Sequence, residues 1–244
     1  NYGGRLSDLL TFVHEGGHAI HSYLSTRHQP YAMAKAPRFI SEIPSTVNEI
    51  LVMEFLRKNA KTRKEKIFFL NKKIGVFRNK VFRMAQYAEL ELAIHQEVTK
   101  NGAISGDKLN QLNLRLIREY AGHGKGGVHV AEEAAILWAL FPHLYRGIIL
   151  YGYATSYIAA ATIAHKILHH GFGPTYVAKL LKAGGSKEAH NILKDMGVDL
   201  TTKGPYTIAF AQFKESLDTL EKLLFAKKLQ KNRRKIEGGT NPVF

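Results

Sequence analysis

The stretch "TFVHEGGHAIH" at residues 11–21 contains two histidines four positions apart, with a glutamate directly after the first. On an α-helix, positions i and i+4 lie on one face, so His14 and His18 can direct their imidazole nitrogens at one metal ion about 2 Å away. Glu15 lies about 100° around the helix, where it can take a proton from a water molecule at the ion without binding the ion itself. Two ligands and one base are the residues that peptide hydrolysis by zinc requires.

A catalytic zinc ion usually has three protein ligands, so the two histidines leave one ligand to find. The chain contains no cysteine, and the third ligand must therefore be a histidine, aspartate or glutamate. Glu42 in "ISEIPSTVNE" is the nearest good candidate. Glu49 follows seven residues later and can support a ligating histidine if one helix covers both glutamates. We interpret His21 as a supporting or packing residue and expect one zinc ion per chain.

The alternative to a metal site is a surface helix with solvated histidines. Apolar residues flank the motif on both sides, namely Phe12, Val13, Ala19 and Ile20. A helix with this composition is too apolar to be simply exposed. The pattern therefore favours the metal interpretation.

Apolar residues recur at helical spacing along most of the chain, and alternating strand patterns are nearly absent. The sequence predicts an all-α fold with one catalytic domain at residues 1–225 and a basic tail at 226–244, whose end, "RRKIEGGTNPVF", should be frayed. The expected helices cover about 6–25 with Ser7 as N-cap, a segment after Pro44, 67–92, 105–121, about 132–169 with a break near Pro142, two short segments that end at Gly184–Gly185 and Gly197, and a last helix from Pro205. The segment "HGKGGVH" at 123–129 should be a flexible loop.

Residues 147–164, "GIILYGYATSYIAAATIA", are uncharged and reach the threshold length for a membrane span. Their glycines, tyrosines and hydroxyl residues make a buried helix the better interpretation, and we expect no membrane association. The opening residues lack the basic start and apolar run of a signal peptide, and the lack of cysteine is compatible with a reducing compartment. We expect a cytoplasmic protein.

A second histidine pair, His165 and His169, is also four residues apart, but no carboxylate follows either residue. The pair approaches the end of a helix that Gly171 should stop. Because histidine suits the negative pole of a helix, the sequence favours a role at the helix end.

The net charge of +15 raises the alternative of a nucleic-acid or acidic-surface binder. The basic residues are spread along the chain rather than interleaved with aromatic residues, and no nucleic-acid motif is present. We therefore expect no nucleic-acid partner.

The sequence resembles the oligoendopeptidase F branch of the thimet-oligopeptidase-like zinc metallopeptidases. The likeness covers most of residues 1–225 in order, including "GRLSDLLTFVHEGGHAIHSYLS", "SEIPSTVNEILV", "FRMAQYAELELAIHQEVTKNGAISGDKLNQL", "WALFPHLYRGIILYGYATSYIAAATIA" and "ILKDMGVDLTTKGPYTIAFAQF". It implies a zincin-like helical domain that forms one wall of a channel for short peptides.

The resemblance also implies roles for individual residues. It maps the zinc ligands onto His14, His18 and Glu42, and the catalytic glutamate onto Glu15. It maps groups that face the scissile carbonyl onto His143 and Tyr153, and further candidates onto Tyr151, Tyr145 and Tyr157. A phenol or an imidazole N–H at this place can donate a hydrogen bond to the developing oxyanion. Packing of the tyrosines in the core is the alternative.

Two features depart from the family pattern. Gly16 stands where family members usually carry a large apolar residue, which predicts a looser helix after the first ligand. Family members are also about twice as long or more, and the additional part lies upstream and supplies the other wall of the channel. The leading hypothesis is a zinc endopeptidase that acts on oligopeptides and completes its channel with an N-terminal half or with a second copy. The alternative is a zinc-binding piece that is inactive without that half.

Overall fold

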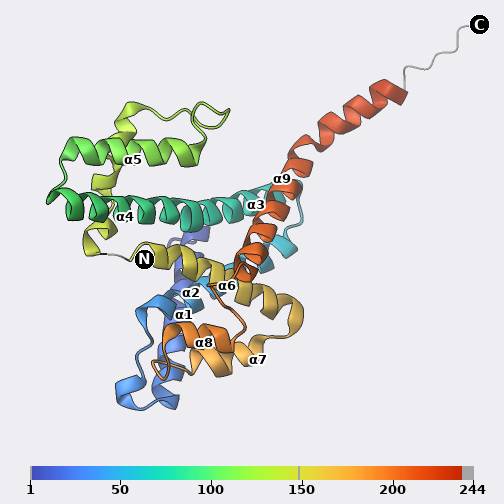
Figure 1. Cartoon of the computed structure of the whole chain (residues 1–244). Coiled ribbons are helices and arrows are strands. Elements are labelled where there is room, and N and C mark those ends of the chain that lie inside the picture. Colours follow the sequence, from blue (N-terminus) through green and yellow to red (C-terminus); the bar gives the residue numbers. More distant parts are fainter. Residues whose placement is uncertain (1, 148, 238–244) are drawn as a thin grey trace, which may run out of the picture.

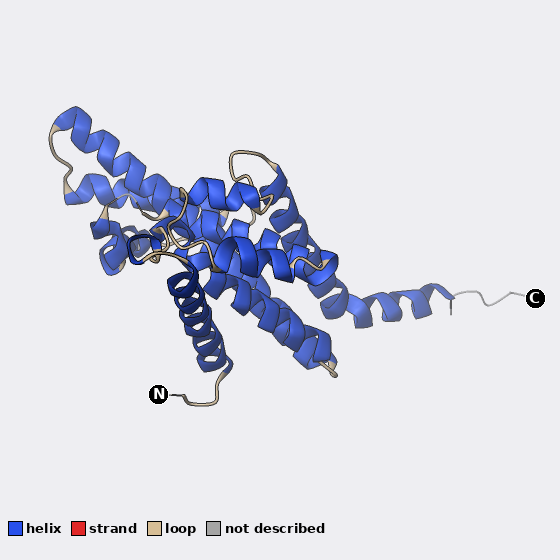
Figure 2. Cartoon of the chain, turned by 90° about the horizontal axis from the view of Figure 1, so that it is seen from below, coloured by secondary structure: helices blue, strands red, loops and turns tan. Residues whose placement is uncertain are grey.

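The computed structural model describes residues 2–147 and 149–237, and no strand occurs in these ranges, which confirms the all-α prediction (Figures 1 and 2). The α-helices are α1 (Leu6–His28), α2 (Arg38–Asn59), α3 (Arg63–Phe77), α4 (Arg83–Asn101), α5 (Gly106–Ala121), α6 (Tyr151–His170), α7 (Gly173–Tyr176), α8 (Ala189–Asp195) and α9 (Gly204–Glu237). Short 3₁₀ segments are η1 (Tyr31–Met33), η3 (Glu132–Leu140) and η4 (Pro142–Arg146), and π turns are η2 (Arg78–Phe82) and η5 (Val177–Leu181).

Helix α1 carries His14, Glu15 and His18 (the HExxH motif) and begins at Leu6 as predicted, but the prediction that Ser7 caps it is wrong. The Asp8 carboxylate instead accepts hydrogen bonds from the backbone N–H groups of Gly3 and Arg5, at 2.9 and 3.0 Å. An acidic side chain in the first turn also suits the positive pole of the helix. The helix therefore starts one residue before Ser7.

Helix α2 starts at Arg38, so the prediction that it begins after Pro44 is wrong. Proline lacks the N–H that would bond to the Ile40 carbonyl one turn earlier, which usually costs about 3 kcal/mol inside a helix. Ile40, Ile43 and Val47 are fully buried on the core side of this helix. Their burial offsets the lost hydrogen bond, and the helix continues through the proline.

Helices α3 and α4 form the long rod at the upper part of Figure 1 and follow one another through the π turn η2. The sequence predicted one continuous helix over this region. A π turn adds one residue without ending the helix, so the apolar spacing alone could not reveal it. Helix α5 is capped by Ser105 and ended by Gly122 with a φ of 65°, as predicted, and it packs on α4.

The region predicted as helical from about residue 132 divides at Pro142, but η3 and η4 have 3₁₀ geometry and only α6 is an α-helix. Residues 156–164 of α6 are all buried, which confirms the buried helix. None of the described helices is long and apolar enough to cross a membrane.

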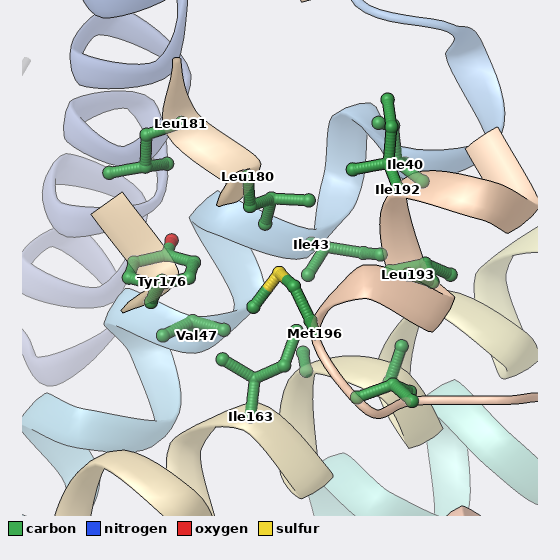
Figure 3. Packing of buried hydrophobic residues seen from close by; sticks show 13 residues of the cluster. Ile40, Ile43, Val47, Ile163, Tyr176, Leu180, Leu181, Ile192, Leu193 and Met196 are labelled. Carbon is green, nitrogen blue, oxygen red and sulfur yellow. The ribbon is translucent and has the colours of Figure 1, made fainter. Parts of the chain in front are cut away.

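The main core lies where α2 and α6 meet η5 and α8 (Figure 3). Met196 occupies the centre of this view among Ile43, Leu180 and Ile163. A second cluster joins Phe77 to α6 and α9, and a third joins α4 and α5 to the start of α6. Helix α6 contributes to all three clusters and so fixes the position of α2, which carries Glu42.

The last helix, α9, opens with Pro205 in its first turn as predicted and extends away from the other helices (Figure 1). The predicted basic tail at 226–244 begins inside this helix, whose backbone continues to Glu237. Residues 238–244, where fraying was also predicted, lie outside the described part.

Candidate metal centre

His14 and His18 lie on the same face of α1, as their spacing requires. Their ring centroids are 4.8 Å apart in an edge-on arrangement, and the two Nε2 atoms face one another at 3.2 Å. Both side chains are partly buried, with 20% and 33% of their surface exposed. The helix therefore presents two nitrogen donors to one point that solvent can still reach.

Glu42 of α2 brings a carboxylate to the same point. Its Oε2 atom lies 3.5 Å from Nε2 of His14 and 3.8 Å from Nε2 of His18. Tetrahedral zinc with bonds of about 2.0–2.1 Å holds neighbouring donors about 3.3 Å apart. The three donor atoms lie within 4.8 Å of one another. Among the described residues, His14, His18 and Glu42 form the one cluster of three or more such side chains that could hold a metal ion. Their chemistry and spacing fit a zinc ion.

Glu49 holds the other edge of the His14 ring. Its Oε1 atom lies 2.5 Å from Nδ1 of His14, and this hydrogen bond raises the pKa of His14. With the Nδ1 proton donated to Glu49, the lone pair of Nε2 faces His18 and Glu42. Such an outer carboxylate fixes the tautomer and orientation of a ligating histidine. Helix α2 covers both Glu42 and Glu49, which is the condition under which the sequence predicted that Glu49 supports a ligating histidine.

The close approach of α1 and α2 depends on Gly17. A Cβ atom at this position would lie 2.5 Å from Cα of Ser45 and 2.7 Å from its backbone nitrogen. Ser45 is fully buried, and Asn48 adds a hydrogen bond of 3.2 Å to the carbonyl of Val13. A glycine opposite a small residue lets Glu42 reach the two histidines. The pair Gly17 and Ser45 was missed from the sequence, although both residues are small.

Glu15 is exposed and follows His14 on α1, and no side-chain hydrogen bond holds it among the described residues. Gly16 has open space around its α-carbon, with nothing within 4 Å of the position that a Cβ atom would take. His21 is buried and does not belong to the three-residue group. Burial lowers the pKa of His21, which fits the packing role.

A pocket of about 200 Å³ begins at Glu42 and extends along the start of α6. Tyr151 and Tyr153 line it, so the structure brings these two candidates to the same hollow as the third ligand candidate. Tyr153 is half-buried and Tyr151 is exposed, with its ring 6.3 Å from that of Phe39. Arg38 also lines the pocket, one helical turn before Glu42, and was not predicted as a site residue. The signal for Arg38 in the sequence is its i, i+4 spacing from Glu42, which places both residues on one face of a helix.

The remaining candidates lie at different distances from this pocket. His143 is half-buried beside Tyr153, with ring centroids 5.8 Å apart, but it does not line the pocket. Its Nδ1 atom is buried without a hydrogen-bond partner in the described structure. Tyr145 is exposed. Tyr157 packs edge-on against Phe77, and burial raises the pKa of its phenol, which agrees with the core-packing alternative.

The chain is similar to known proteins both in sequence and in structure. The sequence pattern described as "Peptidase family M3" matches residues 4–212. The chain is 35% identical over 226 residues to "Oligopeptidase PepF" of Bacillus subtilis, and the alignment covers 92% of this chain and 33% of that protein.

Two crystal structures are similar to the chain over most of its length. One is a protein from Chlamydophila abortus, with a TM-score of 0.82 and 33% identity over 91% of this chain and 37% of the other. The second is oligoendopeptidase-F from Enterococcus faecium, with a TM-score of 0.75 and 32% identity over 90% of this chain and 39% of the other. The chain therefore spans 33–39% of the length of these relatives.

Proposed function

Because the chain belongs to peptidase family M3, we propose that it is the catalytic portion of a zinc-dependent oligopeptidase. The proposed reaction is the hydrolysis of internal bonds in short peptides. The observation that carries this proposal is the convergence of His14, His18 and Glu42 on one point of the surface, beside the exposed Glu15.

His14, His18 and Glu42 would hold the zinc ion, and Glu49 would orient His14. When bound, the ion supplies Lewis acidity that activates a water molecule for attack on the peptide carbonyl. Donor atoms spaced 3.2, 3.5 and 3.8 Å apart support this assignment. Two neutral imidazoles and one carboxylate form a ligand set typical of catalytic zinc.

Glu15 is the proposed general base. As the water attacks, the carboxylate takes its proton, and it then delivers that proton to the nitrogen of the leaving amine. Its position directly after His14, with no competing hydrogen bond among the described side chains, supports this role.

Tyr153 is the proposed donor to the oxyanion that develops on the carbonyl oxygen. The phenol lines the same pocket as Glu42, so a peptide bound there passes between α2 and the start of α6. Tyr151, at the exposed rim, is the second candidate donor. His143 would act from behind Tyr153, where its ring fixes the position of the phenol. A well-placed donor of this kind is worth a few kcal/mol in the transition state.

A second candidate function is zinc binding without turnover. It is favoured by one observation, that the chain spans only about a third of the length of its relatives. In that case a further chain segment or a second copy must supply the opposite wall of the peptide channel. Both candidates share the same zinc ligands and differ in whether the chain alone cleaves a peptide.

The experiment compares the wild type with Glu15→Gln, and uses Glu133→Gln, an exposed glutamate of η3, as the matched control. Zinc content and cleavage of a quenched fluorescent peptide are measured on the same samples. We expect one tightly bound zinc ion per chain in all three proteins and cleavage reduced by about 10²–10⁴-fold only in Glu15→Gln. Cleavage at the wild-type rate by Glu15→Gln would refute the assignment of the base. Zinc binding without cleavage by the wild type would support the second candidate.

A further inference from the structure

Helix α6 carries a second pair of histidines with the same spacing as the pair on α1, although its rings are tilted at 47° to one another rather than edge-on. His165 and His169 are four residues apart, and their ring centroids are separated by 4.7 Å, compared with 4.8 Å for His14 and His18. The helix ends at His170, where Gly171 adopts a φ of 63°. A favourable position at the helix end accounts for His169, which lies in the last turn. It does not account for His165, which lies one turn earlier.

The pair faces a pocket of about 250 Å³ between α6 and α9, with α2 and α3 forming the remaining walls. His165 is half-buried, His169 is exposed, and Glu215 of α9 lines the same pocket. Burial, and then the neighbouring imidazoles, lower the pKa of His165, whereas the charge of Glu215 opposes this shift and so acts on the ring. The site is therefore wide enough for a hydrated ion and offers nitrogen donors together with a carboxylate.

The cations that line this pocket are largely compensated. Glu54 receives ion pairs from Arg57 and Lys73, at 2.9 and 2.5 Å, which leaves Lys58 as the remaining lysine of the lining. An incoming cation would therefore meet the two imidazoles, the carboxylate of Glu215 and the exposed Lys58, whose side chain can move into solvent.

We propose that His165 and His169 form a second binding site for a divalent transition-metal ion, such as zinc or nickel, with Glu215 as the third ligand. Two histidines on successive turns of a helix chelate such ions in the same way as the pair of an HExxH helix. Glu215 is exposed, and its side chain has to rotate to reach the ion, since the only preassembled three-residue group in the described structure is the one at His14. This site is consequently weaker than the candidate centre on α1. The ion would join α6 to α9 and stabilise their contact.

The experiment titrates zinc into the chelator-treated full chain and measures stoichiometry by calorimetry. The wild type should bind two ions of different affinity, and His165→Ala should bind one. His18→Ala should lose the tighter ion and keep the weaker one, and the double variant should bind none. His28→Ala, which removes an exposed histidine on another helix, is the matched control and should bind two.

A thermal unfolding scan gives an independent readout of the same site. In the His18→Ala background, zinc should raise Tm, and both His169→Ala and Glu215→Gln should reduce this rise. His169 is exposed, so its replacement leaves the fold intact. Retention of two ions by His165→Ala, or no binding by His18→Ala at millimolar zinc, would overturn the proposal. Neither outcome bears on whether the α1 centre cleaves peptides.

Discussion

Replacing Gly17 by alanine tests whether the contact between α1 and α2 builds the metal centre. The added Cβ would lie 2.5 Å from Cα of Ser45, whereas carbon atoms in contact are normally about 3.5–4.0 Å apart. The helices would have to separate by about 1 Å. The neighbouring atoms belong to the backbone of Pro44 and Ser45, so no side-chain rotation can relieve the contact.

Two opposing terms set the size of the effect. Overpacking of this kind costs about 1–3 kcal/mol, and the upper end applies where backbone must move. Alanine in place of glycine favours the helix by about 1 kcal/mol. We therefore expect Gly17→Ala to lower the free energy of unfolding by about 2 kcal/mol. At Gly16 nothing lies within 4 Å of the added atom, so Gly16→Ala should gain about 1 kcal/mol from the helix term alone.

Urea unfolding of the two variants, with chelator present, measures the difference between their free energies of unfolding, which should be about 3 kcal/mol. Zinc affinity, measured by competition with a chelator, should fall at least tenfold in Gly17→Ala because a shift of about 1 Å separates Glu42 from the histidines. It should be unchanged in Gly16→Ala. If Gly17→Ala were as stable as Gly16→Ala and bound zinc equally well, the close approach would not be what positions the ligands.

Three further variants test other contacts. Glu49→Ala should weaken zinc binding about 10–100-fold by releasing Nδ1 of His14, and unchanged affinity in chelator competition would contradict its orienting role. Lys73→Met should cost about 2 kcal/mol at pH 7. Burial alone would raise the pKa of the Glu54 carboxyl, but the ion pairs with Lys73 and Arg57 lower it below its usual value of 4.5. The stability that these ion pairs contribute is therefore fully present above pH 4.5, and it is lost as the pH falls through the lowered pKa of the folded protein. Unfolding curves at pH 7 and pH 3 should therefore show a smaller difference from wild type at pH 3. Arg38→Gln should reduce kcat/KM about fivefold for peptides with an acidic residue near the cleaved bond, equivalent to about 1 kcal/mol. An equal effect on the matched amide peptides would exclude a charge contact.

The residues that could be predicted from the sequence are those fixed by short-range geometry. The spacing of His14 and His18 predicts their shared face, and the apolar run in α6 predicts a buried helix, because both follow from the helical repeat. The sequence placed Glu42 near the histidines, as the structure does, although it did not predict where the helix that carries Glu42 begins.

The errors arise where tertiary packing decides between local alternatives. Pro44 looked like a helix start, but burial of Ile40 and Ile43 extends the helix through it. The turn η2 adds a residue without interrupting the apolar pattern of the helix. In short segments such as η3, the apolar pattern of a 3₁₀ helix cannot be distinguished from that of an α-helix. The contact of Gly17 with Ser45 joins two helices, and no local periodicity encodes such a distance.

The ligand candidates and Glu49 all lie between residues 14 and 49, on two consecutive helices joined by a short connection. Tyr151 and Tyr153 follow about a hundred residues later in the chain. Contacts between sequence neighbours form sooner during folding than contacts that must close a long intervening segment. Under the proposed function, α1 and α2 would therefore be able to bind the ion before α6 docks, at a stage of folding when Tyr151 and Tyr153 are not yet in place beside it.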